Sequence, residues 1–543
     1  MTLPLSSSPA LEHLSAAALA GRLSGNTELV LLDLREEGVF ARGHLFLAAS
    51  MPLSRLELRV RSTVPRLDTP IVLIADTSAD TQLAAQRLSR GGYTQLAVLD
   101  GGNAAWTAAG YRLFSGIYVP SKAFGEAVEH ANHTPRVTVD EVRAAMRKGD
   151  TMSKGEKPCH VDSRPLSEFR DFSLPGASDC PGAELVLRAP AAAQGRPIIV
   201  NCAGRTRSII GAQSLINAGV PNPVYALENG TMGWHLSGYE LRHGAEELLA
   251  LPDDAELGNA RQRARALAQG LGVRWIDAAT LQAMLAERQQ TTYCFDVRLP
   301  EDYAAGHLPG FANAPGGQLV QSTDFYAPVR NARMVLFDTL GVQAPMTAHW
   351  LRQMGWEVAV LESSLNGNAE SGWPPPHLLH GPAPTPAVEG AELAALLRHP
   401  QTLLIDCDDS RGYRRSHLRE ARFLTRSRIA QLADPQYQGR TMVFTSEDGL
   451  LAQFAAADAA ALGLRAAHIK GGTRAAAAAV GRSGELHLLC DTDDAWYSPY
   501  QLDTGRKQAM RDYISWETGL LERLQDEPGV RFAVHVARAA GGA

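Results

Sequence analysis

Cysteine is scarce in this sequence: the chain has six among 543 residues, irregularly spaced and without a CxxC pair. This spacing excludes a disulfide-stabilised scaffold and contains no zinc-binding pattern, so we expect no metal site. An excess of charge of one sign is also missing, because the formal net charge is only −6. We therefore expect no basic surface for nucleic acids or acidic membranes.

Long apolar runs are missing too. No stretch reaches the roughly 18 apolar residues that a membrane-spanning helix needs. Residues 1–25 lack the basic segment and following apolar segment of a signal peptide. We therefore expect a cytoplasmic protein whose thiols stay reduced.

The length and composition are those of an ordinary globular protein, with 45% hydrophobic and 20% charged residues. Internal repetition then sets the architecture. Four apolar, strand-like runs end in an aspartate: Asp33, Asp162, Asp296 and Asp406. Eleven residues later each copy has a related turn, which begins at His44, Ser173, His307 and His417.

Two further landmarks repeat in the same order. A second apolar run leads into a loop that starts 40 or 42 residues beyond each aspartate, at Ala75, Cys202, Asp338 and Ser446. A glycine suited to a left-handed helix end follows 17 residues later, at Gly92, Gly219, Gly355 and Gly463. The alternation of short apolar runs with amphipathic segments predicts an α/β fold of four tandem domains, each a small parallel sheet flanked by helices.

Polar and proline-rich stretches set the expected domain boundaries. The four domains are predicted at residues 1–115, 116–245, 255–373 and 384–482, and a C-terminal extension with one helix at residues 487–543. The proline-rich segment 374–386 is the clearest linker. In the extension, Asp503 or Thr504 is expected to cap a helix with Met510, Tyr513, Leu520 and Leu524 on one face. We favour packing of this helix on a domain surface over a role as a lid or docking element.

One loop carries chemistry. Cys202 follows the apolar run 197–200 and precedes a helix predicted at residues 209–218, in the order Cys-Ala-Gly-Arg-Thr-Arg-Ser. A cysteine at such a turn meets the backbone N–H groups of the coming helix, which favour the thiolate. A buried, inert cysteine is the alternative, but a core position has no use for Gly204, Arg205 and Arg207. We interpret the loop as a thiolate nucleophile in an anion-binding cradle.

The Asp-x-Arg strand end, the His-Leu-Pro-Gly turn and the Cys-x-x-x-x-Arg loop together resemble the rhodanese family of sulfurtransferases. The resemblance covers residues 14–481 as four rhodanese-like domains. It is greatest to bacterial thiosulfate sulfurtransferases with four tandem domains.

This resemblance implies a reaction in two steps. Cys202 attacks the outer sulfur of thiosulfate or of a related persulfide donor, and its persulfide then passes the sulfur to cyanide, a small thiol or a protein acceptor. The resemblance implies no metal and no organic cofactor. The substrate would be held by the remaining loop residues, namely Ala203, Gly204, Arg205, Thr206, Arg207 and Ser208.

Individual roles can be ranked further. Arg207 closes the loop, whereas Arg205 is expected to point to the pocket mouth or to solvent. Ser208 is expected to cap the following helix. Asp162 and Arg164 are expected to tie strand ends together, and Arg188 is a weaker candidate for the pocket.

The other three loops are predicted to be catalytically silent. They begin at Ala75, Asp338 and Ser446, have no arginine at the sixth position, and carry acidic but no basic residues. An anionic donor would be repelled there. The remaining cysteines are expected to be core residues, with Cys180 the one candidate for resolving a persulfide. His44, His307 and His417 are interpreted as turn-stabilising groups.

Two other functions remain open. The first is a Cys-x5-Arg phosphatase, whose loop places the arginine six residues after the cysteine to surround a larger anion. Here Arg207 stands five residues after Cys202 and Ser208 stands at the sixth position, so the loop is one residue short. A scaffold or sulfur-relay protein that docks a partner through the silent domains is the alternative from another class. Retention of a partner by both wild type and Cys202→Ser would favour the scaffold.

Overall fold

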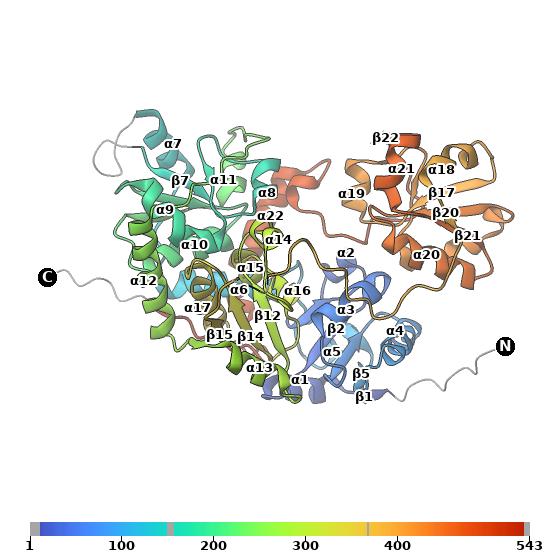
Figure 1. Cartoon of the computed structure of the whole chain (residues 1–543), viewed down its shortest axis with the longest axis horizontal. Coiled ribbons are helices and arrows are strands. Elements are labelled where there is room, and N and C mark those ends of the chain that lie inside the picture. Colours follow the sequence, from blue (N-terminus) through green and yellow to red (C-terminus); the bar gives the residue numbers. More distant parts are fainter. Residues whose placement is uncertain (1–10, 149–156, 366, 368, 537–543) are drawn as a thin grey trace. The chain divides into compact units, whose positions relative to one another are not determined.

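The structure is a computed structural model, and it describes residues 11–148, 157–365, 367 and 369–536 (Figure 1). Outside the described residues lie 1–10 of the first predicted domain, 149–156 of the second, 366 and 368 of the third, and 537–543 of the C-terminal extension. The described part contains four parallel five-stranded sheets. When the strands of each sheet are counted in chain order, every sheet has the order 1-5-4-2-3. This confirms the predicted α/β fold of repeated domains.

The strands of the four sheets are short. The first sheet contains β1 (Glu12–Leu14), β5 (Leu96–Leu99), β4 (Ile71–Ile74), β2 (Val30–Asp33) and β3 (Ala48–Ser50). The second contains β6 (Arg136–Val137), β10 (Val224–Leu227), β9 (Ile198–Asn201), β7 (Cys159–Asp162) and β8 (Ser178–Asp179). The third contains β11 (Arg274–Ile276), β15 (Glu357–Leu361), β14 (Arg333–Phe337), β12 (Thr292–Asp296) and β13 (Ala312–Asn313). The fourth contains β16 (Ala387–Val388), β21 (Arg465–Ile469), β20 (Thr441–Thr445), β17 (Thr402–Asp406) and β19 (Arg422–Phe423), beside a small antiparallel pair of β18 (His417–Leu418) and β22 (Arg482–Ser483).

Helices connect the strands. Around the first sheet these are α1 (Ala16–Ser24), α2 (Glu37–Phe40), η1 (Leu53–Arg55), α3 (Leu56–Thr63), α4 (Ser78–Arg90) and α5 (Gly102–Ala108). Around the second they are α6 (Val119–Asn132), α7 (Val139–Lys148), α8 (Leu166–Asp171), η2 (Gly182–Glu184), α9 (Leu185–Ala193), α10 (Thr206–Asn217) and α11 (Gly230–Leu236). The third has α12 (Asp254–Gly270), α13 (Ala278–Ala286), α14 (Pro300–Ala305), α15 (Gly316–Gln321), α16 (Thr323–Tyr326) and α17 (Gln343–Gln353). The fourth has α18 (Gly390–Leu397), α19 (Ser410–Arg415), η3 (Arg426–Ala433), η4 (Pro435–Tyr437), α20 (Leu450–Ala461) and α21 (Gly472–Val480).

The C-terminal extension contains η5 (Pro499–Gln501), α22 (Arg506–Thr518) and the single turn α23 (Leu520–Arg523). The expected capping by Asp503 or Thr504 is wrong. Gly505 precedes α22 in the left-handed conformation, with φ of 71°, and no side chain caps the helix. Met510 and Leu520 are fully buried, as the predicted apolar face requires.

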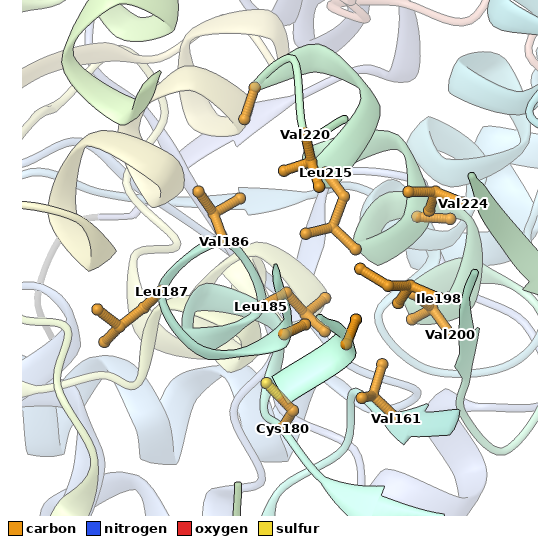
Figure 2. Close-up of a cluster of buried hydrophobic side chains, with 14 of the residues drawn as sticks. Val161, Cys180, Leu185, Val186, Leu187, Ile198, Val200, Leu215, Val220 and Val224 are labelled. Atoms are coloured by element: carbon orange, nitrogen blue, oxygen red, sulfur yellow. The ribbon is translucent and has the colours of Figure 1, made fainter. Parts of the chain in front are cut away.

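Strand β9 illustrates why the sheets form. All four of its residues are buried, as expected for a central parallel strand covered on both faces. Ile198 and Val200 belong to the core cluster that includes side chains of α9 and α10 (Figure 2). Ile199 belongs to the opposite cluster, with side chains of α7, α8 and α11. Alternate side chains thus face opposite helix layers, and the strand delivers Cys202 to its carboxyl end.

The repeated landmarks have the predicted structural roles. The four glycines at the helix ends all have positive φ, between 66° and 95°, at Gly92, Gly219, Gly355 and Gly463. The three turn histidines are buried, stack on an aromatic ring four residues earlier, and hydrogen bond to backbone carbonyl groups: His44, His307 and His417. These are structural roles, as expected for turn residues.

The described chain divides into two compact units. Along the chain, the two sheets of one unit come before and after the two sheets of the other, an arrangement that we call nested pairing. One unit comprises residues 11–19, 30–117 and 376–498, with the first and fourth sheets, and the other comprises residues 20–29, 118–375 and 499–536, with the second and third. In the first unit, Arg426 of η3 forms a buried ion pair with Glu57 of α3, at 2.7 Å. In the second, the indole N–H of Trp350 donates to Ser214 Oγ at 2.8 Å. The boundaries between the four predicted domains stay a prediction.

Candidate functional site

Cys202 directly follows β9, and α10 begins four residues later at Thr206. Its side chain is buried, with 2% of its surface exposed. Two hydrogen bonds from the start of α11 hold the loop: the backbone N–H of Thr231 donates to the carbonyl oxygen of Cys202 (2.8 Å), and that of Met232 to the carbonyl oxygen of Ala203 (2.9 Å). The loop is thereby fixed at the carboxyl edge of the sheet, where ligand sites of parallel sheets lie.

The thiol of Cys202 is hydrogen bonded from within its own loop. The hydroxyl of Ser208 donates to Cys202 Sγ at 3.1 Å, so Ser208 does not cap the helix as expected, because α10 already begins at Thr206. Burial raises the pKa of the thiol, the charge of Arg207 and the hydrogen bonds of Ser208 lower it, and the carboxylate of Glu517 raises it. The net pKa lies above its ordinary value. The charge and donors of the loop therefore act in the expected direction, but in this arrangement desolvation outweighs them.

Arg207 faces a carboxylate on α8. Its guanidinium donates to both oxygens of Glu168, at 2.7 and 2.8 Å, and to Gln318 Oε1 of α15 at 3.2 Å. Although burial opposes ionisation of Glu168, the charge of Arg207 lowers the pKa of this carboxyl below its ordinary value. The Arg207 guanidinium is therefore held in a fixed orientation, close enough to Cys202 to lower the pKa of the thiol.

Arg205 does not point to the mouth or to solvent, so that expectation is wrong. It is 6% exposed and donates to both oxygens of Glu126, at 2.8 Å each, and to Glu129 Oε2 at 2.6 Å. Both carboxylates come from α6, which packs against α10. Although burial lowers the pKa of Arg205, the charges of Glu126, Glu129 and Glu517 raise it. The side chain ties the loop to α6, and its charge is already neutralised.

The silent loops reveal what the backbone of the Cys202 loop offers. In the third sheet, the carboxylate of Asp338 accepts hydrogen bonds from the backbone N–H groups of Gly341, Val342 and Ala344, at 2.8, 2.8 and 2.9 Å. These donors stand three, four and six residues after Asp338, as Arg205, Thr206 and Ser208 stand after Cys202. In the fourth sheet, Ser446 Oγ accepts from the N–H of Ala452, again six residues on, at 3.2 Å. The loop backbone is therefore an anion-binding concavity.

Asp162 and Arg164 have the structural role that we expected. Arg164 is fully buried, pairs with both carboxylate oxygens of Asp162 at 2.9 and 2.8 Å, and donates to the carbonyl oxygen of Phe172. The proposed approach of Arg188 to the pocket is wrong. Its guanidinium pairs with Glu184 and donates to a backbone carbonyl outside the Cys202 loop.

Cys180 is a core residue. It is fully buried among apolar side chains of the second sheet and α9, as its sulfur atom in Figure 2 shows. Burial raises the pKa of this thiol well above its ordinary value, which disfavours a role as a resolving nucleophile. The other cysteines away from the loop are half-buried or buried, at Cys159, Cys294, Cys407 and Cys490, and none of the six is in a disulfide.

The C-terminal extension lies against the Cys202 loop, which sequence analysis did not favour. Glu517 of α22, 1% exposed, accepts a hydrogen bond from the hydroxyl of Thr206 at 2.5 Å. Tyr500 of η5 is hydrogen bonded through its hydroxyl to Thr231 Oγ1 at 2.7 Å. A Cβ atom added to Gly204 would lie 3.3 Å from the ring of Tyr513. The extension thus covers the Cys202 loop. In the sequence, only its acidic and aromatic composition indicates that it contacts the site.

Among residues 11–148, 157–365, 367 and 369–536, no group of three or more His, Cys, Asp or Glu side chains is arranged to hold a metal ion. No helix in the described part of the chain is long and apolar enough to cross a membrane.

Comparison with known proteins identifies the family. The rhodanese-like domain matches residues 15–109, 138–237 and 277–370, together more than half of the chain. The chain belongs to the rhodanese family.

Individual relatives agree with this assignment. The crystal structure of thiosulfate sulfurtransferase from Pseudomonas aeruginosa is 42% identical, covers 96% of this chain and 100% of its own, and superimposes with a TM-score of 0.91. The uncharacterized protein YqhL of Bacillus subtilis (strain 168) is 35% identical over 83 residues, which are 15% of this chain and 64% of that protein. The chain therefore spans somewhat less than two thirds of the length of this curated relative.

Proposed function

We propose that the protein transfers a sulfane sulfur from thiosulfate through a persulfide on Cys202. The enzyme is a rhodanese-type sulfurtransferase, as membership of the family and the similarity to a thiosulfate sulfurtransferase over nearly the whole chain indicate. The observation that supports this proposal is that Cys202 stands at the loop position at which Asp338, in the third sheet, accepts three backbone hydrogen bonds. We expect a negatively charged sulfur at Cys202 to be stabilised by the donors of its own loop, of which Ser208 already contacts the thiol.

The proposed first step is a displacement at sulfur. After the thiol has lost its proton, the thiolate attacks the outer sulfur of thiosulfate, a new S–S bond forms, and the old S–S bond breaks with its electron pair leaving on sulfite. Charge is conserved, because thiolate and thiosulfate dianion give a persulfide anion and a sulfite dianion. The backbone N–H and hydroxyl of Ser208 and the charge of Arg207 stabilise the anionic sulfur throughout.

The second step restores the enzyme. A cyanide ion or a thiolate attacks the terminal sulfur of the persulfide, and Cys202 leaves as the thiolate. A small thiol, cyanide or a protein acceptor fits this chemistry equally well. The other three loops supply no nucleophile of this kind, because Ala75, Asp338 and Ser446 stand at the cysteine position. The cytoplasmic location expected from the sequence stays a prediction.

Mass spectrometry tests the proposal directly. Intact protein is incubated with thiosulfate and then with cyanide, using wild type, Cys202→Ser and Cys294→Ser as a matched control. We expect one added sulfur on wild type and on the control, removed by cyanide as thiocyanate, and none on Cys202→Ser. An unmodified wild type would exclude thiosulfate as donor. Sulfur on Cys202→Ser would place the nucleophile elsewhere.

A further inference from the structure

The C-terminal helix α22 places a carboxylate at the start of α10, beside the nucleophile. Glu517 Oε1 accepts a hydrogen bond from the Thr206 hydroxyl and a longer one, 3.4 Å, from the Thr206 backbone N–H. Its other oxygen, Oε2, is buried without a hydrogen-bond partner. A Cβ atom at Gly204 would lie 3.2 Å from Oε2. Glu517 therefore packs against the anion-binding loop. One of its oxygens is buried without a hydrogen bond, and this desolvation costs free energy.

The carboxylate also acts on the nucleophile. Its charge raises the pKa of the Cys202 thiol, whereas that of Arg207 lowers it. Cys202 is only 2% exposed, so a donor reaches Cys202 only when the covering segment moves. The groups that a donor meets next to Cys202 are then those that Glu517 now occupies, namely the hydroxyl and N–H of Thr206 at the positive end of α10.

A buried ammonium group interacts electrostatically with Glu517. Lys122 of α6 is 3% exposed, and its ammonium nitrogen stands 5.2 Å from the ring centre of Tyr513 and 5.0 Å from that of Trp516, both on α22. Burial lowers the pKa of Lys122 to about 8, and the negative charges of Glu517 and Asp324 oppose this shift. Lys122 is on α6 and not on α22, so it remains beside the loop when α22 moves away.

We propose that the Glu517 carboxylate occupies the subsite for the sulfonate (–SO3) end of the donor, that the two exclude one another, and that Lys122 is the counter-charge for that sulfonate. The proposal rests on the proposed function, because the donor is taken to be thiosulfate. Glu517 and the sulfonate carry like charge and hydrogen-bond acceptors only, so they compete for the same donors. The required displacement of Glu517 then raises the concentration of anionic donor that half-fills the subsite.

Protection of Cys202 by sulfite tests the subsite without sulfur transfer. The rate of alkylation of Cys202 by neutral iodoacetamide is followed by peptide mass spectrometry at increasing sulfite concentrations. Loss of the repelling charge in Glu517→Gln is expected to lower the half-protecting sulfite concentration about tenfold, and loss of the attracting charge in Lys122→Met to raise it about tenfold. Glu522→Gln, which removes an exposed carboxylate of the neighbouring turn α23, is expected to leave it unchanged.

A change in packing alone would give a different pattern. Looser packing of α22 would speed alkylation in the absence of sulfite for both variants, and would not move the sulfite concentrations in opposite directions. An unchanged or higher half-protecting concentration in Glu517→Gln overturns the proposal, and this variant decides alone if Lys122→Met fails to fold. Because sulfite binding needs no persulfide, this failure is distinct from a failure of wild type to take sulfur from thiosulfate.

Discussion

Replacing Gly230 by alanine places a methyl group against the backbone of the Cys202 loop. Gly230 begins α11 with φ of 52°, and a Cβ atom there would lie 2.2 Å from the carbonyl oxygen of Cys202 and 2.8 Å from that of Gly204. Both obstacles are backbone atoms, so no side chain can rotate away. The loop must move by roughly 1 Å to restore an ordinary contact, which strains the hydrogen bonds donated by Thr231 and Met232.

The expected magnitudes follow from these contacts. A left-handed alanine costs about 1–2 kcal/mol, and weakening two hydrogen bonds costs about 0.5–1.5 kcal/mol each. We therefore expect Gly230→Ala to lower the free energy of unfolding of its unit by roughly 2–5 kcal/mol. Displacement of the nucleophile by about 1 Å is expected to slow persulfide formation about 100-fold.

The fourth sheet offers a matched control. Gly472 occupies the same place beside the loop of Ser446, with φ of 64°, and a Cβ atom there would lie 2.1 Å from the Ser446 carbonyl oxygen. We expect Gly472→Ala to destabilise its own unit to a similar degree while persulfide formation keeps the wild-type rate. Both rates are measured by intact-mass spectrometry after thiosulfate is added, and both stabilities by denaturant unfolding. A wild-type rate in Gly230→Ala, or an equal loss in Gly472→Ala, would refute the reasoning.

Three other substitutions test groups away from the sulfur atom. Asp338→Ala leaves three backbone N–H groups without their acceptor and should destabilise the second unit by about 2–4 kcal/mol with an unchanged rate of persulfide formation; an unchanged melting temperature would contradict this. Arg205→Met leaves Glu126 without its counter-charge and Glu129 paired with Arg136 alone, and should cost about 3–5 kcal/mol in denaturant unfolding, most of it recovered when Glu126 becomes glutamine as well. Burial raises the pKa of Asp179 from 3.8 to about 8, so the folded state retains a proton that the unfolded state releases, and its stability falls as pH rises between these values. Relative to Asp179→Asn, the free energy of unfolding of wild type should fall by roughly 3 kcal/mol between pH 5 and 7. Parallel stability profiles of the two proteins over this pH range would exclude the raised pKa of Asp179.

Much of the fold is predictable because each repeat satisfies local requirements. An apolar run such as 197–200 is typical of a strand buried on both faces, and a glycine such as Gly219 marks the left-handed end of the following helix. The spacing between these landmarks differs by at most two residues among the four copies, so one recognised copy predicts the others. The nested pairing of the sheets has no such signal, because it depends on contacts such as Arg426 with Glu57, more than 300 positions apart.

The site divides in the same way. Cys202 and its backbone cradle are local and could be identified from seven consecutive residues. The partners of the loop arginines could not, because Glu126 and Glu168 belong to helices that precede the loop by 79 and 39 residues. The sequence therefore predicts Arg205 at the pocket mouth or in solvent, whereas the structure pairs it with carboxylates of α6. Glu517 is still more distant, 311 positions from Thr206, and an acidic residue in an amphipathic helix gives no sign of what it faces.

The nested pairing has a consequence for synthesis on the ribosome. The first sheet is complete by residue 117, but the segment that pairs with it begins only at residue 376, roughly 260 residues later. At about 5–20 residues per second, this interval lasts on the order of 13–50 s. During that time Leu58, which packs against the core of the fourth sheet, and Glu57, which pairs with Arg426, lack those partners. The first sheet therefore emerges with an incomplete face that is open to chaperones, while the second and third sheets can already pair as they are made.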